Sequence, residues 1–248
     1  MKFGLKLWST NVDLMDRAIQ LIDEKIFYYI ELFVVPGTRI SPFMVDVPYI
    51  IHIPHHNFGV NIGEANKQEI NISKINESIE WADKLNARYL ILHAGYGLMK
   101  DAEKLLQEIW DNRILIENMP KVGVNGESMI GYSPRQIEEL INGREMGFCL
   151  DFGHAIKAAI SLKLGYKEIL SDFQKLKPEL FHICDGDLEN EKDSHLNIGA
   201  GSFDMQYIKE IIENNSSNLI TLETPRSNQL SLDEDLENIN ILKRIWDL

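Results

Sequence analysis

Residues 180–204, LFHICDGDLENEKDSHLNIGAGSFD, join an apolar strand-like segment to an acidic loop and a turn with two glycines. Within this stretch, five of the acidic and imidazole side chains stand out: His182, Asp185, Asp187, Asp193 and His195. A charged loop by itself is most often a solvated surface. Imidazole and carboxylate groups at this density are also typical of a metal site, so the rest of the chain must show whether the arrangement is repeated.

Short apolar runs and stretches with helical spacing alternate along the whole chain. The runs that predict strands are residues 3–8, 28–35, 49–52, 89–93, 113–117, 147–151, 180–184 and 219–223. The predicted helices are residues 12–23, 65–85, 101–110, 134–141, 154–176 with a break near Gly165, 204–212 and 232–246. Residues 36–46 contain two prolines and a glycine, so the second connection is expected to have a short helix or none. The order predicts an α/β fold, the parallel (β/α)8 TIM barrel.

Length and composition favour one such barrel over residues 1–248. The chain has 248 residues with 44% apolar content, which suits a single barrel-sized domain. A formal charge of −13 argues against a basic nucleic-acid footprint and favours a small-molecule partner. We find no apolar run long enough to span a membrane and no signal peptide, and we expect a cytoplasmic protein. Cys149 and Cys184 lie in strand-like segments, where buried, reduced thiols are expected.

Metal-ligand side chains stand at the carboxyl ends of the predicted strands. In a parallel barrel these ends and the loops that follow them meet at one mouth, which is the functional face. The residues at or just beyond the third to eighth strand ends are His52, His93, Glu117, Asp151, His154, His182 and Glu223. Together with Asp193 and His195, they predict one convergent site.

Each of these side chains also has a simpler interpretation. A lone His52 or His93 is more often a hydrogen-bonded histidine, and Asp151 before Phe-Gly-His154 is also the pattern of a helix cap. Glu117 follows the aliphatic run ILI, where a carboxylate facing a barrel lumen needs a cation or a hydrogen-bonding partner. The nine groups taken together favour a metal centre. Imidazole and carboxylate ligands suit zinc, manganese or cobalt better than an iron–sulfur cluster.

The order of several short segments resembles the xylose isomerase-like barrel superfamily, which includes sugar and sugar-phosphate isomerases and epimerases and also endonuclease IV, of AP endonuclease family 2. The segments are YIELFVVPG, LHAG, ILIEN, GFCLDFGHA, FHICDGD, DSHLNIGAG and TLETP. Each is weakly specific alone, whereas their order and spacing are strongly specific. The resemblance covers nearly the whole chain.

The resemblance implies different metal sets in its two branches. The isomerase branch implies one divalent ion held by Glu117, Asp151, His182 and Glu223. The endonuclease branch implies three zinc ions: a first held by His52, His93 and Glu117, a second by the isomerase set, and a third by His154, Asp193 and His195. This sequence has candidates for every position, and we expect one to three Zn²⁺ or Mn²⁺ ions per chain.

We rank a sugar or sugar-phosphate isomerase or epimerase first, with Glu117 and Glu223 exchanging a proton across the substrate. An endonuclease IV-like zinc phosphodiesterase is the alternative, and only that alternative implies a nucleic-acid partner. Endonucleases of this type usually carry an aromatic residue shortly after the third-strand histidine, whereas this chain has His52-Ile53-Pro54-His55. A barrel that binds a sugar without turning it over is a third, less favoured reading. No membrane partner is expected, and a homo-oligomer is left open.

Weaker candidates complete the predicted site. Trp8 is placed to stack on a sugar ring, Glu31 to hydrogen-bond a hydroxyl or merely to meet a lysine, and Arg226 to bind a phosphate or carboxylate. For each of them a structural role is about as good an interpretation. The turn at residues 199–201 offers backbone amides to a phosphate, although it is weak support. Residues 118–132 form a long connection with three glycines, which is either a lid or a surface loop.

Overall fold

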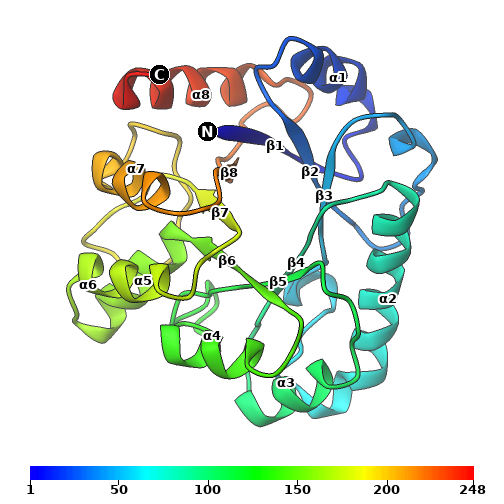
Figure 1. Ribbon diagram of the computed structural model, residues 1–248, viewed down its shortest axis with the longest axis vertical. Helices are drawn as coiled ribbons and strands as arrows, with labels where there is room; N and C mark the ends of the chain where they lie inside the picture. The colour runs from blue at the N-terminus through cyan, green and yellow to red at the C-terminus, as the bar shows by residue number, and fades with distance from the viewer.

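Eight parallel strands close into a barrel in chain order, β1 to β8 (Figure 1). A computed structural model describes residues 1–248. The strands are β1 (Lys2–Trp8), β2 (Tyr29–Phe33), β3 (Tyr49–His52), β4 (Leu90–His93), β5 (Ile114–Glu117), β6 (Gly147–Asp151), β7 (Leu180–Ile183) and β8 (Leu219–Leu222). They lie where the apolar runs predict them, and the (β/α)8 fold is confirmed.

Helices connect the strands and form the outer ring of Figure 1. They are α1 (Met15–Asp23), α2 (Gln68–Lys84), α3 (Met99–Leu106), α4 (Pro134–Ile141), α5 (Phe152–Leu162), α6 (Tyr166–Gln174), α7 (Met205–Glu213) and α8 (Asp233–Trp246). The 3-10 turns are η1 (Val12–Leu14), η2 (Ser41–Phe43), η3 (His56–Phe58) and η4 (Ala65–Lys67). Only η2 lies between β2 and β3, so the expected loss of the second helix is confirmed.

Two predicted helices have different bounds. The helix predicted over residues 101–110 starts earlier, at Met99, and ends at Leu106. Beyond it the chain turns to bury Ile109 while Trp110 remains 91% exposed. The segment predicted over residues 154–176 starts at Phe152 and divides into α5 and α6, because Lys163 takes the left-handed conformation with φ of 57°.

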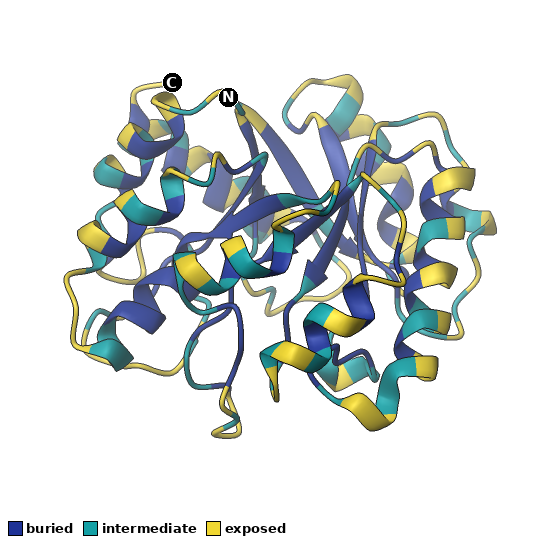
Figure 2. Cartoon of the chain, turned by 60° about the horizontal axis from the view of Figure 1, so that its bottom comes forward, coloured by how far each residue is buried: buried dark blue, intermediate teal, exposed yellow.

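Buried residues concentrate on the strands and on the inner faces of the helices, as the dark segments of Figure 2 show. The main core fills the space between sheet and helices. A separate cluster, which we call the lumen plug, contains one side chain from most strands: Tyr29, Ile50, Ile91, Leu115, Cys149, Leu180 and Leu219. Because side chains on a strand alternate between faces, the residue two positions later on each strand also faces the lumen.

The layer above the lumen plug is therefore polar. It contains Glu31, His52, His93, Glu117, Asp151, His182 and Thr221, each two residues after a plug residue. Strand pairing aligns its members, since His93 pairs with Glu117 and Asp151 with His182. The apolar plug thus forms the base on which the functional layer rests. None of the helices is both long enough and apolar enough to span a bilayer.

Candidate metal centre

A cavity of about 430 Å³ lies at the carboxyl ends of the strands. Its wall contains Lys6, Trp8, His52, His93, His154, Asp193, His195, Glu223 and Arg226. Below it lie the buried carboxylates of Glu117 and Asp151 and the ring of His182. The side chains predicted from the strand ends therefore meet around one cavity.

The first group of potential ligands contains His52, His93 and Glu117, whose donor atoms lie within 4.8 Å of one another. Oε2 of Glu117 is 3.0 Å from Nε2 of His93 and 3.5 Å from Nε2 of His52. These three residues end neighbouring strands, which explains why they converge.

A second group uses the other side of Glu117. Donor atoms of Glu117, Asp151, His182 and Glu223 lie within 4.8 Å of one another. Nδ1 of His182 is 3.3 Å from Oε1 of Glu117 and 3.2 Å from Oε1 of Glu223. Glu117 therefore turns one oxygen toward each group.

The third group forms where the acidic loop folds back over the mouth. Donor atoms of Asp151, His154 and His195 lie within 4.8 Å of one another. Oδ2 of Asp193 is 3.4 Å from Nε2 of His154 and 3.1 Å from Nε2 of His195. Eight of the nine residues predicted as ligands thus belong to three adjoining groups, and Asp193 lies beside the third.

Backbone carbonyls fix the orientation of three imidazole rings. Nδ1 of His52, His154 and His195 lies 2.9, 2.8 and 2.7 Å from the carbonyl oxygens of Ile53, Asn118 and Glu223. Because a carbonyl only accepts, each Nδ1 donates to it, and Nε2 is the ring nitrogen left to bind a cation. Such anchoring of the second nitrogen is typical of metal-binding histidines.

Buried polar atoms without hydrogen-bond partners show that a cation fits here. They include both oxygens of Glu117, both ring nitrogens of His93, Oδ2 of Asp151 and Nδ1 of His182. Buried polar atoms are nearly always satisfied, and an unpaired buried carboxylate is especially costly. Divalent ions would satisfy these atoms together, and the nitrogen and oxygen donors suit zinc or manganese.

The pKa values of the carboxylates reflect the same crowding. Burial alone would raise the pKa of Glu117, but the imidazoles of His93 and His182 hold it well below its ordinary value. Burial raises the pKa of Asp151 to about 6, although His154 opposes this. Without bound metal, Glu117 would therefore lose its proton at a lower pH than Asp151. Bound metal ions would keep both carboxylates deprotonated.

Lys6 is a site residue that the sequence analysis missed. Its Nζ lies 2.5 Å from Oε1 of Glu31 and 2.5 Å from Oε1 of Glu223. Burial alone would lower the pKa of Lys6, but the two carboxylates raise it well above its usual value. Alternation along β1 could have revealed it, since Lys6 lies between Gly4 and Trp8 on the face opposite the main core.

Asn118 and Lys157 were also missed, and both position ligands. The Asn118 side chain exchanges two hydrogen bonds with the backbone of Asp151, at 2.8 and 2.9 Å. Lys157 is buried in α5 and donates to the carbonyl oxygens of Asp187 and Asn190 in the acidic loop. The position of Asn118 directly after Glu117 could have indicated its role at the site. No neighbouring residue in the sequence indicates the role of Lys157.

The three residues predicted to bind substrate lie in different environments. Trp8 is 39% exposed at the mouth and packs against Phe33. Glu31 is fully buried beneath the cavity, where it accepts hydrogen bonds from His182 and Thr221.

Arg226 lines the cavity, but its guanidinium is already engaged. It donates to Asp235 at 2.6 and 2.7 Å and to the carbonyl of Lys6. The arrangement leaves Trp8 as the most accessible of the three predicted contacts.

The expectation that the turn at residues 199–201 offers amides to a phosphate is wrong. The amides of Gly199 and Gly201 donate to Oδ2 of Asp185, at 2.9 and 3.0 Å. The other oxygen of Asp185 accepts from Gly186 and Phe203. Asp185 therefore organises the loop internally and is not a member of the metal centre.

Residues 118–132 form a small folded connection beside the mouth. Val122 and Ser128 form an antiparallel bridge, and a second bridge joins Met129 to Tyr96. Met119, Gly123 and Val124 line the cavity. The segment is a wall of the site, and its role as a lid stays a prediction.

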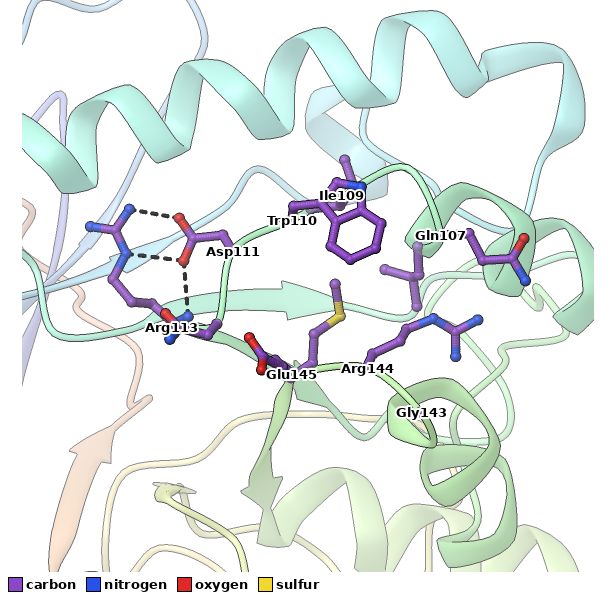
Figure 3. Close-up of a pocket in the computed structure, with 11 residues that line it drawn as sticks. Gln107, Ile109, Trp110, Asp111, Arg113, Gly143, Arg144 and Glu145 are labelled. Carbon is purple, nitrogen blue, oxygen red and sulfur yellow. Dashed lines mark hydrogen bonds and ion pairs between the residues drawn. The ribbon is translucent and has the colours of Figure 1, made fainter.

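A larger hollow, of about 850 Å³, lies where α3 and α4 lead into β5 and β6, at the opposite ends of these strands (Figure 3). Trp110 and Met146 form part of its wall, and Arg113 is bound to Asp111 beside them. It contains no group of potential metal ligands, so size alone does not identify the functional site.

Two relatives cover most of the chain. The chain is 26% identical over 220 residues to the probable endonuclease 4 of Halothermothrix orenii, with 77% of each chain covered. It is 24% identical to an uncharacterized protein of Methanocaldococcus jannaschii, covering 94% of this chain and 96% of that protein.

Solved structures of two kinds share the fold. A D-tagatose 3-epimerase-like protein superposes with a TM-score of 0.77 at 20% identity, with 100% of this chain and 97% of that chain covered. Endonuclease IV from Thermus thermophilus superposes with a TM-score of 0.75 at 19% identity, with 100% and 99% covered. The sequence profile described as xylose isomerase-like TIM barrel matches residues 45–245. The chain therefore belongs to the xylose isomerase-like TIM barrel family.

Proposed function

We propose that this protein is a metal-dependent hydrolase that cleaves a phosphoester bond in a small molecule. The observation that carries the proposal is the position of Glu117 between two ligand groups, with both oxygens buried and without hydrogen-bond partners. A carboxylate in this position is suited to bridge two cations. A carboxylate bound through both oxygens is poorly suited to move a proton to and from carbon.

The charge of the centre supports several ions and an anionic substrate. The centre contains one ammonium and five carboxylates: Lys6, Glu31, Glu117, Asp151, Asp193 and Glu223. With neutral histidines this leaves about four negative charges, which two divalent ions cancel and a third converts to a net positive charge. A phosphate would be repelled by a singly loaded centre and attracted by a fully loaded one.

Divalent ions bound here would make a water molecule acidic at neutral pH and offset the charge of a phosphoryl group. In hydrolysis the water oxygen bonds to phosphorus, the ester P–O bond breaks, the water loses a proton and the leaving oxygen gains one. His52, His154 and His195 would help to hold these ions, because hydrogen bonds to backbone carbonyls fix their rings. Trp8 and Met119 form apolar parts of the cavity wall.

The size and charge of the mouth favour a small substrate. A cavity of about 430 Å³ is within the usual range for small ligands. Lys6 and Arg226 are the lysine and arginine residues of its wall, and both are paired with carboxylates. Binding along a nucleic-acid backbone depends on several free cationic side chains, and the chain carries a formal charge of −13.

An isomerase or epimerase is the second candidate. It is favoured by the donor atoms of Glu117 and Glu223, which lie within 4.8 Å of each other in a group that also contains Asp151 and His182. One ion in that group would leave about two negative charges, which suits an uncharged sugar. Sequence reasoning ranks this function first, and the two-sided position of Glu117 leads us to rank hydrolysis above it.

Metal analysis combined with matched assays tests the choice. We expect the purified protein to retain about two or three zinc or manganese ions and to cleave small phosphomonoesters or phosphodiesters. Glu117→Gln should lower turnover at least about a hundredfold. Glu179→Gln is the matched control, because Glu179 bonds Tyr89 far from the centre.

Three other results would contradict the proposal. Retention of a single ion together with interconversion of ketoses would support the isomerase. Cleavage of abasic-site DNA without cleavage of small esters would contradict the small substrate. Full turnover in Glu117→Gln would remove the assigned role of Glu117.

A further inference from the structure

We propose that Lys6 forms an oxyanion-binding subsite on the floor of the cavity and donates a hydrogen bond to a phosphate oxygen of the substrate. The proposal rests on the proposed function for its chemistry, because it names the protein group that binds the phosphoryl oxygens. It adds a fixed cationic donor to a centre whose other members are metal ligands. No metal ion is needed to place this donor.

The position of Lys6 is set by strand pairing. Lys6 pairs with Glu31 across β1 and β2, and Glu223 follows β8 on the other side of β1. The two carboxylates take two of the three N–H groups of the ammonium. The side chain remains 14% exposed and belongs to the cavity wall, so the third N–H is available to a bound molecule.

The carboxylates of Glu31 and Glu223 fix the position of Lys6, and its ammonium can still donate a hydrogen bond to a bound anion. Glu31 also accepts hydrogen bonds from His182 and Thr221, at 3.0 and 2.6 Å, so its charge is shared among three donors. Glu223 belongs to the second ligand group, where a bound cation would draw on the same carboxylate. A lysine fixed in this way loses little rotamer entropy when it binds an anion.

Neither Arg226 nor the two histidines of the third group offer the same donor. The guanidinium of Arg226 is bound twice to Asp235 and once to the carbonyl of Lys6. His154 and His195 point Nε2 toward Asp193. Lys6 is therefore the side chain best placed to contact phosphate oxygens beside the groups of potential metal ligands.

Phosphate binding to metal-loaded protein tests this role without requiring turnover. Inorganic phosphate is titrated by calorimetry into the wild type, Lys6→Met and Lys6→Arg, after the metal content of each has been measured. We expect Lys6→Met to keep its metal and to weaken the Kd about tenfold or more. Lys6→Arg should retain part of the affinity. The exposed lysine variant Lys167→Met is the control and should bind like the wild type.

A double variant separates the loss of the hydrogen-bond donor at Lys6 from the change in net charge of the site. Glu31→Gln combined with Lys6→Met restores the net charge but supplies no ammonium, and we expect its phosphate affinity to stay low relative to Glu31→Gln alone. This comparison also serves if Lys6→Met by itself fails to fold. Equal affinity in the two proteins would overturn the inference, as would a metal-loaded wild type that binds no phosphate.

The failure of the proposed function has a different signature, namely phosphate binding that depends on Lys6 in a protein that cleaves no phosphoester. Conversely, a wild type that cleaves phosphoesters and whose Lys6→Met variant binds phosphate with unchanged affinity would retain the proposed function and remove Lys6 from it.

Discussion

His182 donates through Nε2 to the carboxylate of Glu31, 3.0 Å away, and this bond turns its Nδ1 toward Glu117 and Glu223. The relationship predicts that Glu31 controls the metal affinity of the second group. In Glu31→Ala, loss of the acceptor should weaken zinc binding about 10- to 100-fold. Competition with a chromophoric chelator measures this. Glu179→Ala should leave the affinity unchanged, and equal affinity in both variants would contradict the role of Glu31.

Lys157 should control the third group through the acidic loop. Its buried ammonium donates to the carbonyls of Asp187 and Asn190, at 2.5 and 2.7 Å. Lys157→Met leaves these carbonyls without the donor, and we expect loss of about one ion per chain and about 1–3 kcal/mol of stability. Elemental analysis and proteolysis within residues 187–194 report the two effects. Lys167→Met provides the exposed comparison, and an unchanged metal content in Lys157→Met would refute the prediction.

Removal of metal should destabilise the whole barrel, because the carboxylates of Glu117, Asp151 and Glu223 lie together in one group of potential ligands. An ion present at about 100 times its Kd contributes about 2.7 kcal/mol. For a chain of this size, chelation should therefore lower Tm by roughly 5–10 °C. Differential scanning calorimetry with and without chelator, followed by re-addition of zinc or manganese, measures the shift. An unchanged Tm would argue against bound metal.

Acid stability should depend on Asp111, far from the metal centre. Burial alone would raise the pKa of Asp111, but hydrogen bonds from Arg113 lower it below its ordinary value (Figure 3). A depressed folded-state pKa stabilises the protein above the unfolded value, near 3.9, and this contribution is lost as the pH falls through the folded value.

The matched variant is Asp111→Asn, which lacks this titration. We expect the wild type to exceed it by about 1 kcal/mol at pH 5 to 7 and the difference to shrink below about pH 4. Urea unfolding at a series of pH values measures it. A difference that stays constant down to pH 3 would exclude the ion pair as its source.

The sequence was sufficient to predict the strands and the convergence of the candidate ligands, because both follow local rules. Apolar runs mark the strands, and a parallel barrel brings every strand end to the same mouth. His52, Glu117 and Asp151 could therefore be grouped without knowledge of side-chain geometry. Helix ends were less predictable: α3 ends at Leu106 because burial of Ile109 redirects the chain, and no residue near Trp110 signals this.

The contacts of the residues that surround the candidate ligands depend on how neighbouring strands are aligned, and the sequence alone does not show this alignment. Lys6 meets Glu223 across 217 positions of sequence, and its role follows only when β1 is placed between β2 and β8. Glu31 was expected either to reach a substrate hydroxyl or to meet a lysine, and its ion pair with Lys6 agrees with the second expectation. His182, on the same lumen layer, also hydrogen-bonds this carboxylate. Arg226 is similarly engaged by Asp235 from the following helix, α8.

The lumen plug closes the barrel below the polar layer, from Tyr29 on one strand to Leu219 on another. Substrate and products must then enter and leave through the same open end of the barrel, because apolar packing blocks the other end. Each turnover has to empty the chamber before the next can begin. If the protein hydrolyses phosphomonoesters as proposed, phosphate would occupy the same cavity as the substrate, so inhibition by phosphate should be competitive in steady-state kinetics.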